Sequence, residues 1–255
     1  MATNTKNVIV GAANLFVSKS EDSARKGTTS AILTGATADG GFLASGQSAR
    51  TGLLATGTTY REVGYTNSGL EISYEPNYGE VTVDQLLDAA RLFKQSLKVT
   101  LKTELVEATL ENLTLSWGQM DTYYVNNTGS AISSVNSLAD TTPVSGEPGS
   151  TLNMAAGALG DAPVERTLIA VGNAPAKIKN AESSYTSDAD ISAKRNKERV
   201  YVARRVVSME TTSHGLKRDS ATVFPVSFRC LPDDSNYAYA GSEYGVVIDR
   251  VWGSN

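Results

Sequence analysis

The stretch that decides the fold lies at residues 69–118 and reads GLEISYEPNYGEVTVDQLLDAARLFKQSLKVTLKTELVEATLENLTLSWG. Within it, residues 96–106 alternate between apolar and polar side chains. As a strand, this segment would place Leu97, Val99, Leu101 and Leu105 on one face and Lys98, Thr100, Lys102 and Glu104 on the other. A period of two is typical of a strand with one packed face and one wet face. The stretch therefore predicts two or three strands of a half-buried sheet.

A short amphipathic helix is expected to follow this strand without a loop. Apolar residues recur at helical spacing from Ala108 to Trp117. Glu107 and Glu111 lie in the N-terminal half of this helix, where the helix dipole favours negative charge. We expect the helix to pack on the apolar face of the sheet. The predicted helix–sheet core consists of Leu97, Val99, Leu101, Leu110, Leu113 and Trp117.

The composition is that of an ordinary globular protein. The chain has 255 residues, of which 40% are hydrophobic and 20% charged, and its net charge is −4. This charge argues against a protein that grips nucleic acid, because phosphate binding needs clustered Lys and Arg. No apolar run approaches the length of a membrane span, and no signal peptide is visible. We expect a soluble protein that is made in the cytosol and does not contact a membrane.

The sequence offers little catalytic chemistry. His214 is the only histidine and Cys230 the only cysteine, so His-rich zinc sites and an intrachain disulfide are excluded. His214 lies in a Ser-His-Gly-Leu-Lys turn, and the chain has neither a Gly-x-Ser-x-Gly elbow nor a phosphate-binding loop. We expect no catalytic, metal or cofactor site and no enzyme activity.

The organisation is that of a single domain over residues 1–255 with two irregular regions. Residues 18–60 form a long arm rich in Gly, Ser, Thr and Ala, which is expected either to be disordered or to pack on something else. Residues 119–163 form a Ser/Thr/Gly-rich surface loop or insert. Further strands are predicted near residues 7–17, 165–171, 199–209, 221–231 and 244–251.

Five segments, in order along the chain, carry a resemblance to one protein family. They are NVIVGAANLFV at 7–17, REVGYTNSGL at 61–70, ELVEATLENL at 104–113, FPVSFRCLPD at 224–233 and YGVVID at 244–249. Together they resemble the tail tube proteins, or major tail proteins, of long-tailed bacteriophages of the siphovirus type. The resemblance covers roughly half of the chain.

The resemblance implies a mainly β fold with one short α-helix, a β-sandwich or partial barrel with long extended arms. It implies a virion protein of the phage tail that is synthesised in the host bacterial cytoplasm. Six copies are expected to form a ring, and stacked rings a hollow tube for DNA. The partners would be other copies of the chain, a tape measure protein and the tail terminator and tip proteins, with DNA only in transit through the lumen.

The resemblance also implies that strands from residues 70–106 line the bore of such a tube. Alternation then predicts a wet inner face with three carboxylates against two ammonium groups, which is slightly acidic. Its predicted members are Glu71, Ser73, Glu75, Lys98, Thr100, Lys102 and Glu104. A one-residue error in register would invert this face.

A second hypothesis stays open. A soluble β-sandwich that binds carbohydrate, or an adhesin-like module, would carry aromatic residues on an exposed concave face. Tyr237, Tyr239 and Tyr244 near the C-terminus would supply them.

Overall fold

The computed structural model describes residues 9, 11–18, 47–55, 58, 60–82, 91–119, 124–126, 150–152, 154, 156, 159–160, 163–175, 196–209, 213–216, 218–219, 221–232 and 243–252. Most of the expected arm at 18–60, most of the expected insert at 119–163, and both Tyr237 and Tyr239 lie outside these residues. Within the expected insert, β5 (Tyr124–Asn126) and β6 (Ser150–Leu152) pair as a separate two-stranded antiparallel sheet.

The other strands form one antiparallel sheet of eight strands, so the prediction of a mainly β protein is confirmed. The order in the sheet is β2-β1-β7-β8-β9-β4-β3, and β10 pairs with β8 off this path. The strands are β1 (Asn14–Ser18), β2 (Tyr60–Glu62), β3 (Thr66–Val81), β4 (Arg91–Leu105), β7 (Glu165–Asn173), β8 (Asn196–Ser208), β9 (Phe224–Cys230) and β10 (Gly245–Trp252). The five predicted strand regions outside residues 69–118 are therefore matched by β1, β7, β8, β9 and β10.

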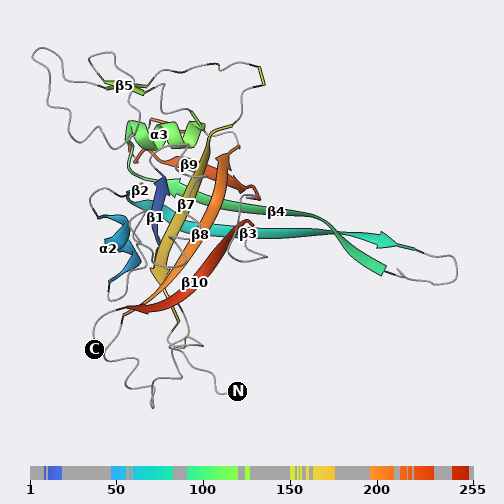
Figure 1. Cartoon of the computed structure of the whole chain (residues 1–255). Coiled ribbons are helices and arrows are strands. Elements are labelled where there is room, and N and C mark those ends of the chain that lie inside the picture. The colour runs from blue at the N-terminus through green and yellow to red at the C-terminus, as the bar shows by residue number, and fades with distance from the viewer. Residues whose placement is uncertain are drawn as a thin grey trace, which may run out of the picture.

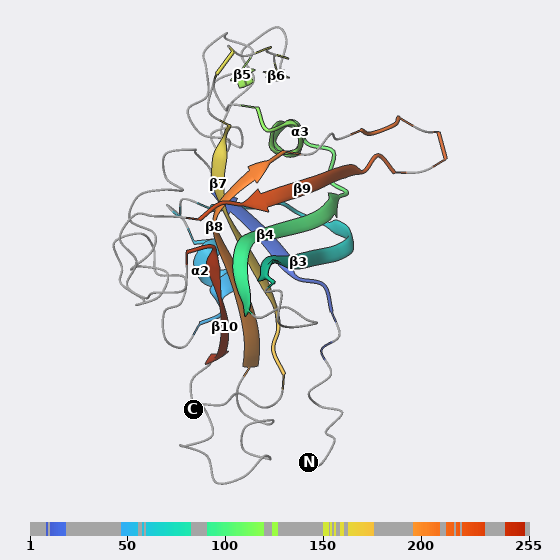
Figure 2. The same cartoon turned by 90° about the vertical axis from the view of Figure 1, so that its right-hand side faces the viewer.

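β8 joins two parts of this sheet that run in different directions. Its first part pairs with β10 and β7, whereas only its last three residues, from Val206 to Ser208, pair with β9. Figures 1 and 2 show β9, β4 and β3 running across the direction of β1, β7 and β8. The sheet thus folds over itself and encloses a core between its two parts.

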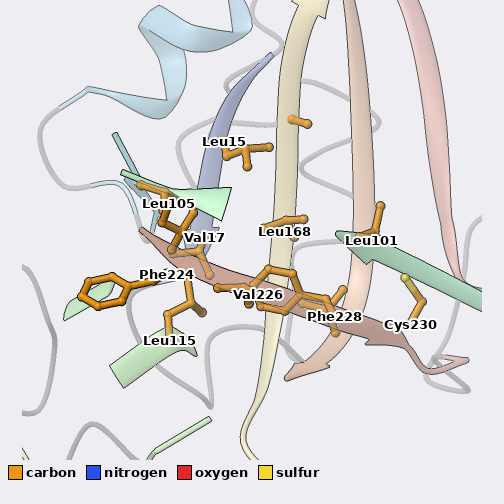
Figure 3. Packing of buried hydrophobic residues seen from close by; sticks show 13 residues of the cluster. Leu15, Val17, Leu101, Leu105, Leu115, Leu168, Phe224, Val226, Phe228 and Cys230 are labelled. Atoms are coloured by element: carbon orange, nitrogen blue, oxygen red, sulfur yellow. The ribbon is translucent and has the colours of Figure 1, made fainter. Parts of the chain in front are cut away.

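Two apolar clusters cover the two faces of β1 and β7. On one face, Leu15 and Val17 meet Leu101, Phe224 and other residues of the crossing strands (Figure 3). On the other face, Phe16 and Ile169 pack under α2 (Ala49–Leu53). Strands buried on both faces carry continuous apolar runs, which explains LFV in β1 and LIAV in β7.

The described residues contain two helices, so the expectation of a single helix is wrong. α2 was missed because it has only five residues, and its signal is limited to Ser48 at the N-cap. Ser48 accepts a hydrogen bond from the Arg50 amide. The last part of the expected arm therefore packs on the sheet of the same chain.

α3 (Leu110–Trp117) begins later than expected, because residues 106–109 form a connection instead of its first turn. Thr109 is the N-cap, and Gly118 ends the helix in the left-handed conformation with φ 63°. Glu107 lies outside the helix and accepts a hydrogen bond from the Tyr65 amide at 3.0 Å. This contact ties the entrance of β3 to the exit of β4.

The helix also presents a different face to the sheet from the one expected. Leu115 is buried, whereas Leu110, Leu113 and Trp117 are only partly buried, and Leu113 packs at the margin of the core. Asn112 explains this rotation. Its side-chain amide donates to the Val63 and Glu107 carbonyls at 2.9 and 3.0 Å and accepts from Arg61 at 2.9 Å, so a buried polar group with three partners fixes the helix.

Replacing Leu115 should therefore destabilise the fold more than replacing Leu110. We expect Leu115→Ala to lower the free energy of unfolding by about 2–5 kcal/mol, as for a leucine removed from a filled core. Leu110→Ala is the matched control and should lower it by less than half as much. Urea denaturation followed by circular dichroism measures both, and equal losses would contradict the orientation of α3.

Candidate assembly surface

The hairpin of β3 and β4 extends beyond the body of the protein (Figure 1). The two strands pair from Thr66 with Leu105 to Val81 with Arg91. β9 pairs with β4 only from Val99 to Leu105. Beyond Val99, the two strands therefore have only each other among the described residues. From Tyr74 to Val81 the projecting part is about 23 Å long at roughly 3.3 Å per residue.

One face of this hairpin is mainly apolar, and we call it the apolar face. The register places Ile72 opposite Leu101, Tyr74 opposite Val99 and Pro76 opposite Leu97. A register shift follows at Tyr78, and alternation along β3 keeps Tyr78 on the same face. The apolar residues of this face are Ile72, Tyr74, Pro76, Tyr78, Leu92, Leu97, Val99 and Leu101. Toward the tip the same register puts Lys94 opposite Tyr78 and Glu80 opposite Leu92, so this face also carries two charged side chains there.

The apolar face begins in the core and ends in solvent. Leu101 at its root is buried, whereas Tyr74, Tyr78 and Leu92 are 62%, 57% and 59% exposed. The predicted grouping of Leu97, Val99 and Leu101 on one face is correct, but only the root of that face is covered. Several large apolar side chains exposed in a row are typical of an interaction surface.

The opposite face of the hairpin, which we call the charged face, matches the predicted polar set. Glu71 lies opposite Lys102, Ser73 opposite Thr100, and Glu75 opposite Lys98. Directly opposite residues on one face have their Cβ atoms about 5 Å apart, so each lysine has a carboxylate as its cross-strand neighbour. Glu104 instead accepts hydrogen bonds from Asn67 and Ser68 at 2.7 and 3.4 Å.

Two details of the charged face differ from expectation. Thr100 is only 4% exposed, so it is not part of a wet surface. Thr100 has a short side chain and lies between Ser73 of β3 and Arg229 of β9. Lys98 and Lys102 lie two positions away on either side along β4. The longer side chains of Arg229 and the two lysines cover it. Arg229 is exposed and adds a third cation, which makes this face balanced in charge rather than slightly acidic.

An apolar hollow of about 260 Å³ lies between the root of the hairpin and the strands β8 and β10. The residues that line it are aliphatic, aromatic, glycine or Cys230, and none of them is charged. They include Ile72, Tyr74, Tyr201, Tyr244, Val246 and Val247. Tyr244 is partly buried here against the core, so it does not form the exposed aromatic platform that the second hypothesis requires.

The candidate reactive groups lie in inert surroundings. Burial raises the pKa of the Cys230 thiol to about 12, so this thiol stays protonated at neutral pH. The His214 ring packs edge-on against Phe224, with 4.7 Å between the ring centroids. Within the described part of the chain, no group of three or more His, Cys, Asp and Glu residues could hold a metal ion.

Several arginines are held by carboxylates of the same chain. Arg205 binds Glu165 at 2.7 Å, and Arg199 binds Asp249 at 2.7 Å, which raises the pKa of Arg199. The buried Glu198 accepts from the Ala49 amide at 2.8 Å and lies 3.3 Å from Arg250, which fixes α2 to the sheet. Arg199 and Arg205 of β8 are thus each paired with a carboxylate of the same chain.

The chain matched no protein-family model and no curated protein when it was compared with both. Among the described residues, no helix has the length and apolar character needed to span a membrane.

β10 approaches β8 so closely at Gly245 that a side chain would not fit. Gly245 has φ 155°, and a Cβ atom there would lie 2.0 Å from the Val202 carbonyl oxygen. We expect Gly245→Ala to destabilise the protein by about 1–3 kcal/mol, because backbone must shift to relieve the overlap.

Gly69→Ala is the matched control, because Gly69 also has a positive φ, of 72°, but no atom within 4 Å of the added Cβ. Chemical denaturation measures the free energy of unfolding of both variants. The loss for Gly69→Ala gives the cost of a positive φ alone, and the additional loss for Gly245→Ala gives the cost of the overlap. A smaller loss for Gly245→Ala than for Gly69→Ala would contradict the close approach that forms this wall of the hollow.

Proposed function

We propose that this protein is a structural subunit that assembles with copies of itself into hexameric rings, stacked as the hollow tail tube of a long-tailed bacteriophage. The projecting β3–β4 hairpin carries this proposal. Large apolar side chains are exposed in a row along it, and a neighbouring copy that covers them would remove them from water.

The edges of the sheet support assembly. Among the described residues, β3 pairs only with β4, and β10 pairs only with β8. An unpaired edge on a long strand is a template for another strand unless something covers it. Two different edges on one subunit favour head-to-tail contacts, and such contacts produce a ring when the rotation between neighbours closes.

The charged face suits the wall of a channel for DNA. Lys98 and Lys102 lie opposite Glu75 and Glu71, so each of these two lysines has a carboxylate close by that competes with a passing phosphate. A wall with clustered unpaired cations would hold the phosphate backbone instead. In this proposal, DNA moves past the charged face, while the apolar face contacts protein.

The resemblance of the five sequence segments to tail tube proteins supplies the rest of the proposal. The expected partners of the protein are a tape measure protein and the tail terminator and tip proteins. The protein would be made in the cytoplasm of the host bacterium and would reside in the virion.

A binding module remains the second candidate, and one observation favours it. Tyr74 and Tyr78 lie on the same side of the exposed hairpin, and the Lys94 ammonium lies 5.7 Å from the centre of the Tyr74 ring. Exposed aromatic rings in a row also suit the flat faces of sugar rings.

Purified protein observed by negative-stain electron microscopy separates the two candidates. We expect rings or tubes, and sedimentation velocity should show species of six or more subunits that grow with protein concentration. Monodisperse monomers across the micromolar range would contradict the proposal. Retention of such monomers on polysaccharide resins would then favour the binding module.

A density map of the tubes tests the channel wall. We expect Lys98 and Lys102 to face the axis and Val99 to face protein, because the two sets occupy opposite faces of β4. Val99 directed into the bore would show that the charged face is not the wall.

A further inference from the structure

The apolar hollow beside β10 has the properties of a site that binds apolar side chains. Its volume is about 260 Å³, and its rim includes two strongly exposed apolar side chains, Tyr74 and Val247. An apolar cavity of roughly 150 Å³ is large enough to bind benzene. The hollow therefore has room for one large side chain and part of a second, and it offers them no charged partner.

The same chain carries matching side chains that cannot reach its own hollow. Tyr78 and Leu92 lie on the projecting part of the apolar face, and each is more than half exposed. Their hairpin leads away from the body (Figures 1 and 2). Tyr74, at the base of the projecting part, lines the hollow. In the structure, neither Tyr78 nor Leu92 lines the hollow of its own chain. Another copy of the chain can bring them to it.

The exposed area is a substantial part of what a stable contact needs. Four large apolar side chains of the apolar face are 42–62% exposed, and they are Ile72, Tyr74, Tyr78 and Leu92. With aromatic side chains burying about 150–250 Å² each and aliphatic ones somewhat less, these four expose on the order of 400 Å². A specific interface buries about 800 Å² per partner, so these side chains supply about half of one side, and the backbone around them adds to it.

The backbone beside the hollow offers further contacts. Val246 and Val247 belong to β10, whose only pairing among the described residues is with β8. A strand that lies along this edge would gain main-chain hydrogen bonds while its alternate side chains enter the hollow.

We propose that Tyr78 and Leu92 of one copy occupy the apolar hollow of the next copy, beside the edge of β10. This inference rests on the proposed self-assembly and names the surfaces that meet. The hairpin and the hollow are different patches of one chain, so the contact is head-to-tail and each copy both gives and receives a hairpin.

Single charged substitutions test the two surfaces. Leu92→Lys on the hairpin and Val247→Lys at the rim should each raise the critical concentration for assembly at least about tenfold, a loss of roughly 1.4 kcal/mol per contact. Leu216→Lys is the control, because Leu216 is also exposed, at 88%, but lies in neither surface. Thermal denaturation of dilute subunits should give the same midpoint for all three variants.

A crosslink tests the contact directly. The double variant Leu92→Cys/Val247→Cys should form disulfides between copies on mild oxidation, giving a ladder of multimers on a non-reducing gel. Leu92→Cys/Leu54→Cys is the control, because Leu54 is half exposed and lies beside α2. Because Cys230 lines the hollow, both cysteine pairs are made in a Cys230→Ala background, so that only the introduced thiols can form the crosslink.

The outcomes separate this inference from the proposed function. Tubes that form normally with Leu92→Lys and give no ladder with the cysteine pair would overturn the contact while the self-assembly stands. Failure of the unmodified protein to assemble would overturn both. If the cysteine pair does not fold, the lysine series decides alone: equal critical concentrations for Leu92→Lys and Leu216→Lys would refute the contact.

Discussion

The pairing of β4 with β9 stops at Val99, whereas its pairing with β3 continues to Arg91. The two halves of β4 therefore lie in different surroundings. Its second half lies in the core, where Leu101 and Leu105 are buried against β1, β7 and β9. Its first half has β3 as its only neighbour among the described residues. An isolated two-stranded hairpin is marginally stable at best in water, so the projecting half depends on its root for order. In the proposed assembly, a second copy buries its apolar side chains.

The root is held by contacts on several sides. β8 turns from the direction of β7 toward β9 and brings Val206 to Cys230 and Ser208 to Phe228. The Glu107 carboxylate lies over Gly64 and accepts from the Tyr65 amide, and the Val106 amide donates to the Tyr65 carbonyl at 3.0 Å. These contacts fix where β3 and β4 leave the body. The direction of the hairpin is thus set by the core, and its two faces are set by alternation.

The sequence was most informative where one period applied over many residues. Alternation in residues 96–106 correctly placed Lys98 and Lys102 on one face of β4 and Val99 and Leu101 on the other face. It failed for Thr100, because the burial of a short side chain depends on the lengths of its neighbours on β3 and β9, and those strands are far away in sequence. It also left Arg229 out of the charged face, although its own strand alternates clearly, because no local pattern shows which strands become neighbours.

Helical spacing correctly predicted that α3 forms, but not which of its faces packs on the sheet. Leu110, Leu113 and Trp117 form a plausible apolar stripe, yet the buried face includes Leu115 and Asn112 because the Asn112 amide meets three specific partners. Such partners become visible only when the chain is folded. The length of the hairpin beyond the body was hidden for the same reason, since pairing with β9 ends where the crossing strands end.

Amide hydrogen exchange tests the central claim, that the projecting hairpin is covered by another copy. In dilute subunits, the amides of residues 76–81 and 91–97 should exchange fast, while those of residues 101–105 in the core stay protected. In the assembled state, the account predicts that exchange in both projecting segments slows by at least about tenfold. Equally fast exchange of these segments in subunits and assemblies would show that the hairpin stays exposed, and would contradict the account.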